Sequence, residues 1–170
     1  FMLFWQRQED TSALFFAFFC VSGALRQWCT GWFSQEMGMG HSKLGYELLL
    51  SLEYIGISLT VMSGGLFVQS LVPGPRFGRF VQIWCLGFGV LLVGFILMTS
   101  SIVSSKSVVV YQLHVLVGAV VAFAHLTFKA IEGHLLARWV LLALGAVAVG
   151  VANDILVTQQ IINTGFIGPY

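Results

Sequence analysis

The stretch at residues 46–71, YELLLSLEYIGISLTVMSGGLFVQSL, decides the fold. About 20 apolar residues are enough to cross a bilayer as a helix, and this stretch is longer, yet it carries Glu53 inside the apolar run. If the hydrocarbon begins near Leu48, a helical rise of ~1.5 Å per residue places Glu53 roughly 8 Å below the surface. A carboxylate at that depth costs at least ~2.5 kcal/mol, so we expect Glu53 to face protein or water and to have a partner.

The helical spacing of this stretch also indicates a buried helix. One stripe of the helix carries small or polar residues, namely Glu53, Gly56, Thr60 and Gly64. The opposite face carries large apolar residues typical of a lipid-facing surface, namely Leu52, Ile55, Leu59, Met62 and Leu66. We therefore expect the helix to be a buried member of a bundle, with the Glu53 stripe turned toward polar or protein surroundings.

The composition supports a membrane protein. The chain is 58% hydrophobic and 9% charged, whereas a water-soluble domain carries about 25% charged residues. A net charge of +1 argues against nucleic acid as a partner, because nucleic-acid binding needs a clustered basic face. Cys20, Cys29 and Cys85 lie in or beside apolar runs without CxxC spacing, so we interpret them as packing residues.

The rest of the chain divides into similar spans. We expect complete spans at residues 11–31, 46–71, 80–100, 108–130 and 139–158, and the end of an earlier span at residues 1–5. Gly38 and Gly40 break the second connection, and Pro73 and Pro75 stop the helix that contains Glu53. The fourth span holds Gly87, Gly89 and Gly94, which permit close neighbours.

Nothing in these spans alternates with a period of two residues, and lipid forbids unpaired backbone. The predicted fold class is all-α, a polytopic transmembrane helical bundle with five complete spans, the end of span one and the lead-in to span seven. We interpret residues 1–170 as a single transmembrane domain and an internal piece of a longer protein, because FMLFW resembles the last turn of a span and NTGFIGPY stops where another could begin.

The basic residues predict the orientation. Loops on one side contain Arg7, Arg76, Arg79, Lys129 and Arg138, and loops on the other contain Lys43 and Lys106. The positive-inside rule places the larger group in the cytoplasm. This topology predicts seven spans in the parent protein and an N-terminus outside.

With this topology the polar residues inside the membrane gather in its outer half. The candidate network consists of Arg26, Glu53, Gln112, His114, Asn153 and Asp154. Because one cation faces two carboxylates, one negative charge is left to be balanced. A shared proton, a charged His114 or a bound cation could balance it. The network either fixes the order of the helices or forms a coupling or ligand site that opens outward; a third reading places some members in water at the membrane surface.

Other kinds of site find little support in the sequence. His114 and His125 lie on one face of a helix about 16 Å apart, as in a two-haem cytochrome, but His41 and His134 fall in loops and supply no matching pair. No GxSxG, HExxH or clustered metal-ligand pattern occurs. We expect no cofactor, no metal and no catalysis in this region, and interpret His125 as a packing residue.

Several short motifs occur in a distinctive order. They are ALRQWCTG at 24–31, ELLLSLEYIGISL at 47–59, FVQSLVP at 67–73, YQLH at 111–114 and VANDILVTQQIINTGFIGPY at 151–170. Together they resemble the membrane region of bacterial seven-transmembrane receptors with diverse intracellular signalling modules (7TMR-DISM). The resemblance covers nearly the whole chain, and Arg26, Glu53, Asn153 and Asp154 match recurring positions of the pattern.

The resemblance implies a module in the bacterial inner membrane that couples an extracytoplasmic sensor domain, often a β-sandwich, to a cytoplasmic output enzyme. That enzyme would be a histidine kinase, a diguanylate cyclase (GGDEF), a phosphatase or a nucleotide cyclase. The alternative is a small-solute or ion transporter, or a membrane subunit of a larger complex, although no span is interrupted at its middle. The implied partners are the lipid bilayer and the receptor's own two domains. Homodimerisation stays open, since the small-residue faces at 118–122 and 146–150 fit either within or between bundles.

Overall fold

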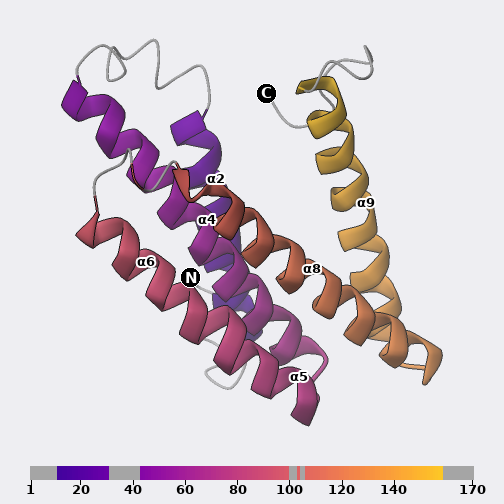
Figure 1. The fold of residues 1–170 in the computed structure, drawn as a ribbon. Helices are drawn as coiled ribbons and strands as arrows, with labels where there is room; N and C mark the ends of the chain where they lie inside the picture. The colour runs from indigo at the N-terminus through magenta and orange to yellow at the C-terminus, as the bar shows by residue number, and fades with distance from the viewer. Residues whose placement is uncertain (1–10, 31–42, 100–102, 104–105, 159–170) are drawn as a thin grey trace. The chain divides into compact units, whose positions relative to one another are not determined.

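The computed structural model describes residues 11–30, 43–99, 103 and 106–158, and this part of the chain contains helices and no strand. In chain order the helices are α2 (Thr11–Thr30), α4 (Lys43–Leu71), α5 (Pro75–Phe80), the π-helix η2 (Val81–Phe88), α6 (Gly89–Met98), α8 (Val108–Ile131) and α9 (Leu135–Thr158) (Figure 1). The predicted all-α fold class is confirmed.

Four helical stretches of the described residues are long and apolar enough to cross a membrane, namely Thr11–Cys29, Gly45–Leu71, Pro75–Met98 and Val108–Ile131. They coincide with four of the expected spans. Within α9, the part whose side chains the structure describes contributes the apolar helical stretch Leu135–Ala146. The helical membrane bundle is therefore confirmed, and the total of seven spans in the parent protein stays a prediction.

The fourth span begins earlier than the sequence pattern predicts. Its helix starts at Pro75 and continues without a break through η2 and α6 to Met98. Proline is favoured at the first position of a helix, because its missing N–H would have no partner there. Arg76 and Arg79 consequently belong to this helix rather than to the connection that precedes it.

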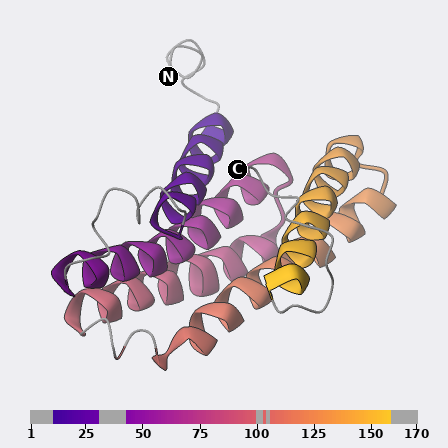
Figure 2. The same ribbon diagram turned by 90° about the horizontal axis from the view of Figure 1, so that it is seen from above.

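Contacts between residues divide the chain into two compact units, Phe1–Ala122 and Phe123–Tyr170. In the first unit α4 is the central helix, since it packs against α2, η2 and α6. Helix α2 crosses α4, and α6 runs alongside it (Figures 1 and 2).

The first unit has a hydrophobic core between α4, α6 and the beginning of α8. Its buried members are Tyr54, Leu92, Ile96 and Tyr111, and the partly buried side chains around it include Ile55. The tyrosine rings stack with their centroids 4.8 Å apart. This core holds together three segments that are remote in sequence.

The second unit contains a tight turn between α8 and α9. Gly133 has φ +95°, a conformation that L side chains rarely adopt. The His134 N–H donates to the Lys129 carbonyl at 3.0 Å, and the Gly133 N–H donates to the Ala130 carbonyl at 3.2 Å. These two bonds form a Schellman motif, which satisfies the last carbonyls of α8 and ends the helix.

One expectation about α4 was wrong in part. Leu59 is exposed, as a lipid-facing residue should be, but Ile55 packs against the core. Met62 lies so close to Gly89 that a Cβ atom there would be 2.7 Å from its Cγ. The face opposite the Glu53 stripe is therefore covered in part by α6 and α8, because α4 has neighbours on more than one side.

Candidate functional site

The small and polar stripe of α4 lies against α2. A Cβ atom at Gly56 would lie 3.3 Å from Cβ of Arg26, and one at Gly64 would lie 3.2 Å from the ring of Phe19. Between these two glycines, Thr60 Oγ1 lies 3.1 Å from Ser22 Oγ. Small residues allow the two backbones to approach closely, which is how membrane helices commonly associate.

The polar contact at the centre of this interface is a short chain of hydroxyls. Ser22 donates its proton to the Phe19 carbonyl at 3.0 Å, so its oxygen is free to accept from Thr60. Thr60 also lies 2.7 Å from the Gly56 carbonyl and shares its single proton between the two acceptors. The interface is thereby fixed by a hydrogen bond between helices as well as by shape.

Glu53 stands at one end of the same stripe and Arg26 stands opposite it on α2. The two side chains are within electrostatic reach of each other. Glu53 is half-buried, whereas Arg26 is exposed. The structure therefore brings together these two members of the predicted network, at the end of the α2–α4 interface that lies toward Thr30.

His114 belongs to α8, and its contacts are with η2. Its ring packs against two aromatic side chains of η2, with centroid distances of 6.0 Å to Trp84 and 5.4 Å to Phe88. Trp84 Nε1 donates to the His114 carbonyl at 3.4 Å. The predicted network is thus divided: Glu53 faces Arg26 of α2, whereas His114 of α8 packs against η2.

Three polar side chains of this second region are almost completely buried. Ser58 and His114 are 0% exposed and Tyr111 is 1% exposed. Ser58 Oγ, Tyr111 Oη and both ring nitrogens of His114 have no hydrogen-bond partner within the described residues. Each buried, unpaired polar group costs about 1–3 kcal/mol, so this cluster is held in place by the packing around it.

The π-helix η2 lies beside this cluster and was missed by sequence reasoning. A Cβ atom at Gly65 of α4 would lie 2.9 Å from Sγ of Cys85, so the backbone of α4 and the side chain of Cys85 are in close contact. π-helical turns are rare and occur frequently at functional sites. The glycines of this span predicted the close packing only in part. Gly89 does contact Met62, but a Cβ atom at Gly94 would meet nothing within 4 Å among the described residues.

The remaining members of the predicted network are less closely placed. Gln112 lies on α8 and is exposed. Asn153 and Asp154 belong to α9, but their side chains lie outside the part that the structure describes. Gly118 packs against α4 within the first unit, since a Cβ atom there would lie 3.0 Å from Cγ1 of Val61.

The histidines and acidic residues of the described part form no group of three or more that could hold a metal ion. His114 is enclosed by aromatic rings. Polar residues between closely packed membrane helices, without a catalytic pattern, are typical of helices that associate specifically and can shift against one another.

The fold and this arrangement define an integral membrane helical bundle with buried polar contacts. A family model described as 7TM diverse intracellular signalling matches residues 1–170, and the chain therefore belongs to that family. It is a transmembrane sensing module linked to intracellular signalling, as the resemblance of its motifs implied. Neither the curated proteins nor the solved structures yielded a match.

Proposed function

We propose that this module couples an extracytoplasmic sensor domain to a cytoplasmic output enzyme, such as a histidine kinase or a diguanylate cyclase. The proposal has the module in the bacterial inner membrane with its N-terminus outside, since the helix ends that carry Arg76, Arg79, Lys129 and Arg138 would then lie on the cytoplasmic side. Catalysis would belong to the output domain. The membrane region would contribute the change of helix packing that controls it.

The observation that carries this proposal is the double role of α4. On one face, Glu53 lies within electrostatic range of Arg26 and the small stripe packs on α2. On another face, Tyr54 stacks on Tyr111 of α8. A shift of α2 that alters its contacts with α4 would therefore also act on the contact between α4 and α8.

The proposed switch is an equilibrium between two packings of these helices. A loaded sensor domain would favour one packing only if it interacts differently with the two states. Unpaired Ser58, Tyr111 and His114 make the observed packing costlier than a fully satisfied one. An alternative packing that satisfies one of these groups would recover part of this cost, and this gain would help to bring the two states of the proposed switch together in free energy.

The test uses the full receptor in membranes, with the product of its own output domain as the readout. Glu53→Gln, Arg26→Gln and the double variant remove the charges; glutamine keeps the size of the glutamate side chain and is shorter than arginine. We expect each single variant to change the response to the signal, and the double variant to resemble the singles instead of adding to them, because the two charges act as a pair.

Glu47→Gln is the matched control, since Glu47 lies on the same helix, six residues before Glu53. All variants are compared at equal membrane abundance. Normal signalling by both Glu53→Gln and Arg26→Gln would show that the network is only structural. Solute flux into proteoliposomes that contain this module alone would instead favour the transporter.

A further inference from the structure

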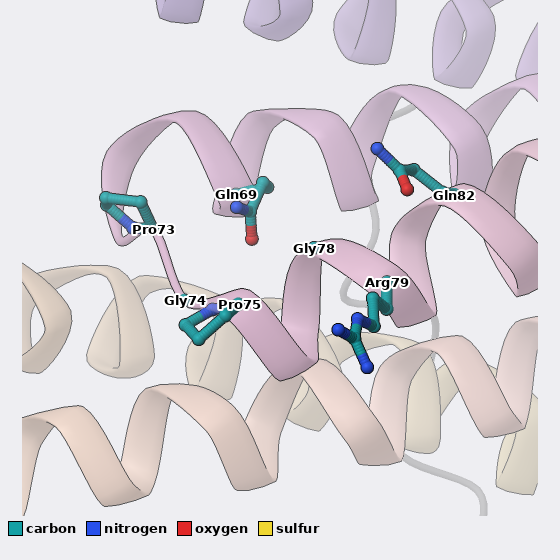
Figure 3. Close-up of a pocket in the computed structure, with 7 residues that line it drawn as sticks. All are labelled: Gln69, Pro73, Gly74, Pro75, Gly78, Arg79 and Gln82. Atoms are coloured by element: carbon teal, nitrogen blue, oxygen red, sulfur yellow. The ribbon is translucent and has the colours of Figure 1, made fainter.

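A pocket of about 370 Å³ opens at the turn between α4 and α5. Residues on both sides of the turn line it, namely Gln69, Pro73, Gly74, Pro75, Gly78, Arg79 and Gln82 (Figure 3). Pockets for small ligands range from about 300 to 1,000 Å³. The volume of this pocket suits a small polar group.

Gln69 is the most constrained polar side chain of the pocket. Its Oε1 is buried and has no hydrogen-bond partner within the described residues. Figure 3 shows the side chain reaching from α4 into the space above the start of α5. Gly78 leaves room for it, because a Cβ atom there would lie 3.1 Å from Nε2 of Gln69. The wall of the pocket thus holds an unsatisfied acceptor, which a turn of the Gln69 amide would bring to the pocket.

The rest of the lining favours a negative charge. Arg79 and Gln82 are both exposed and can donate hydrogen bonds, and no acidic side chain lines the pocket. Neither Arg76 nor Arg79 forms an ion pair within the described residues. A guanidinium matches the geometry of a phosphate group and binds it through two parallel hydrogen bonds.

The position of the pocket along the helices is informative. Two candidate spans, Gly45–Leu71 and Pro75–Met98, meet at this turn. The pocket therefore lies at the end of both spans, where the hydrocarbon gives way to the polar headgroup region of the bilayer. A phosphate at this level is most abundant as part of a phospholipid.

We propose that this pocket binds the headgroup of an anionic phospholipid with a free hydroxyl, namely phosphatidylglycerol. Arg79 pairs with the phosphate and Gln82 donates a second hydrogen bond. The Gln69 amide turns so that its Oε1 accepts from a hydroxyl of the glycerol headgroup. The net positive lining disfavours zwitterionic headgroups, and the acceptor of Gln69 favours a lipid that carries a donor. This site does not depend on the proposed signalling function.

The experiment measures lipids that stay bound when the full chain is released from nanodiscs and weighed by native mass spectrometry. The nanodiscs contain phosphatidylcholine with a minor share of phosphatidylglycerol. Arg79→Gln should lower the retained phosphatidylglycerol by about fivefold, as expected for one arginine near the membrane surface. Arg76→Gln is the matched control, because it removes the same charge three residues away but outside the pocket; it should retain the lipid.

Gln69→Leu tests the acceptor separately. It should abolish the preference for phosphatidylglycerol over phosphatidylmethanol, which has the same charge but no headgroup hydroxyl. Equal losses for Arg76→Gln and Arg79→Gln would overturn the proposal, because attraction to the surface would then be unspecific. Equal retention of phosphatidylethanolamine, or displacement of the lipid by millimolar inorganic phosphate, would also overturn the assignment to phosphatidylglycerol.

Discussion

Tyr54 on α4 and Tyr111 on α8 stack with their ring centroids 4.8 Å apart and their planes 18° from parallel. The hydroxyl of Tyr111 is buried without a hydrogen-bond partner among the described residues. The pair therefore joins the two helices through its ring faces, while the unpaired Tyr111 hydroxyl lowers the stability of the fold.

Tyr111→Phe should leave stability unchanged or raise it by about 1 kcal/mol, because it removes an unpaired polar group and keeps the ring. Tyr111→Ala should lower stability by about 3–5 kcal/mol, because it also leaves a cavity. Unfolding titrations in bicelles measure both. A clear loss of stability in Tyr111→Phe would mean that the hydroxyl has a partner in the folded protein.

Gly65→Ala should destabilise the bundle by about 1–3 kcal/mol, because the added Cβ would meet the short, buried side chain of Cys85. Gly94→Ala is the control in open space and should be neutral or slightly stabilising, since alanine favours helix over glycine. In a Cys85→Ala background, Gly65→Ala should cost less. Equal effects at positions 65 and 94, measured by the same unfolding titration, would contradict this close contact.

Gly133→Ala should cost about 1–2 kcal/mol, because the positive φ of this residue is strained for any residue with a Cβ atom. Gly145→Ala in α9 is the control, since a Cβ atom there would meet nothing within 4 Å of the described residues. Thermal unfolding of both variants in one detergent makes the comparison. If position 133 tolerates alanine as well as position 145 does, the Schellman turn is not required.

Glu132 gives a prediction about pH. Lys129 Nζ donates to Glu132 Oε2 at 2.6 Å, and this hydrogen bond lowers the pKa of Glu132, helped by the charge of Lys129. Because the folded pKa is lower than the unfolded one, the stabilisation is present above the unfolded pKa and is lost as the pH falls through the folded pKa.

The measurement is an NMR titration of the Glu132 carboxyl in micelles. Lys129→Gln should raise the midpoint toward that of a free glutamate, and added salt should act in the same direction. Lys106→Gln, which removes an exposed charge elsewhere, should leave the midpoint unchanged. A midpoint in Lys129→Gln equal to that of the unchanged protein would contradict the pairing.

Local pattern determined much of this fold. The apolar runs predicted the helices to within a few residues, because lipid leaves the backbone no alternative to internal hydrogen bonds. The spacing of Glu53, Gly56, Thr60 and Gly64 predicted a buried stripe, since residues three or four apart share one face of a helix. Both are properties of a single segment and its solvent.

Tertiary structure alone decided which polar residues meet. Glu53 lies opposite Arg26, while His114 turns toward Trp84 and Phe88, and no spacing within one helix specifies its neighbours. The π-helix η2 could not be predicted either, since the same apolar run is compatible with an α-helix and with a π-helix. Its geometry accompanies the close contact of Gly65 with Cys85, which joins two helices. Glu53 on its own indicated a need for a partner; only the crossing of α2 and α4 determined which residue lies opposite it.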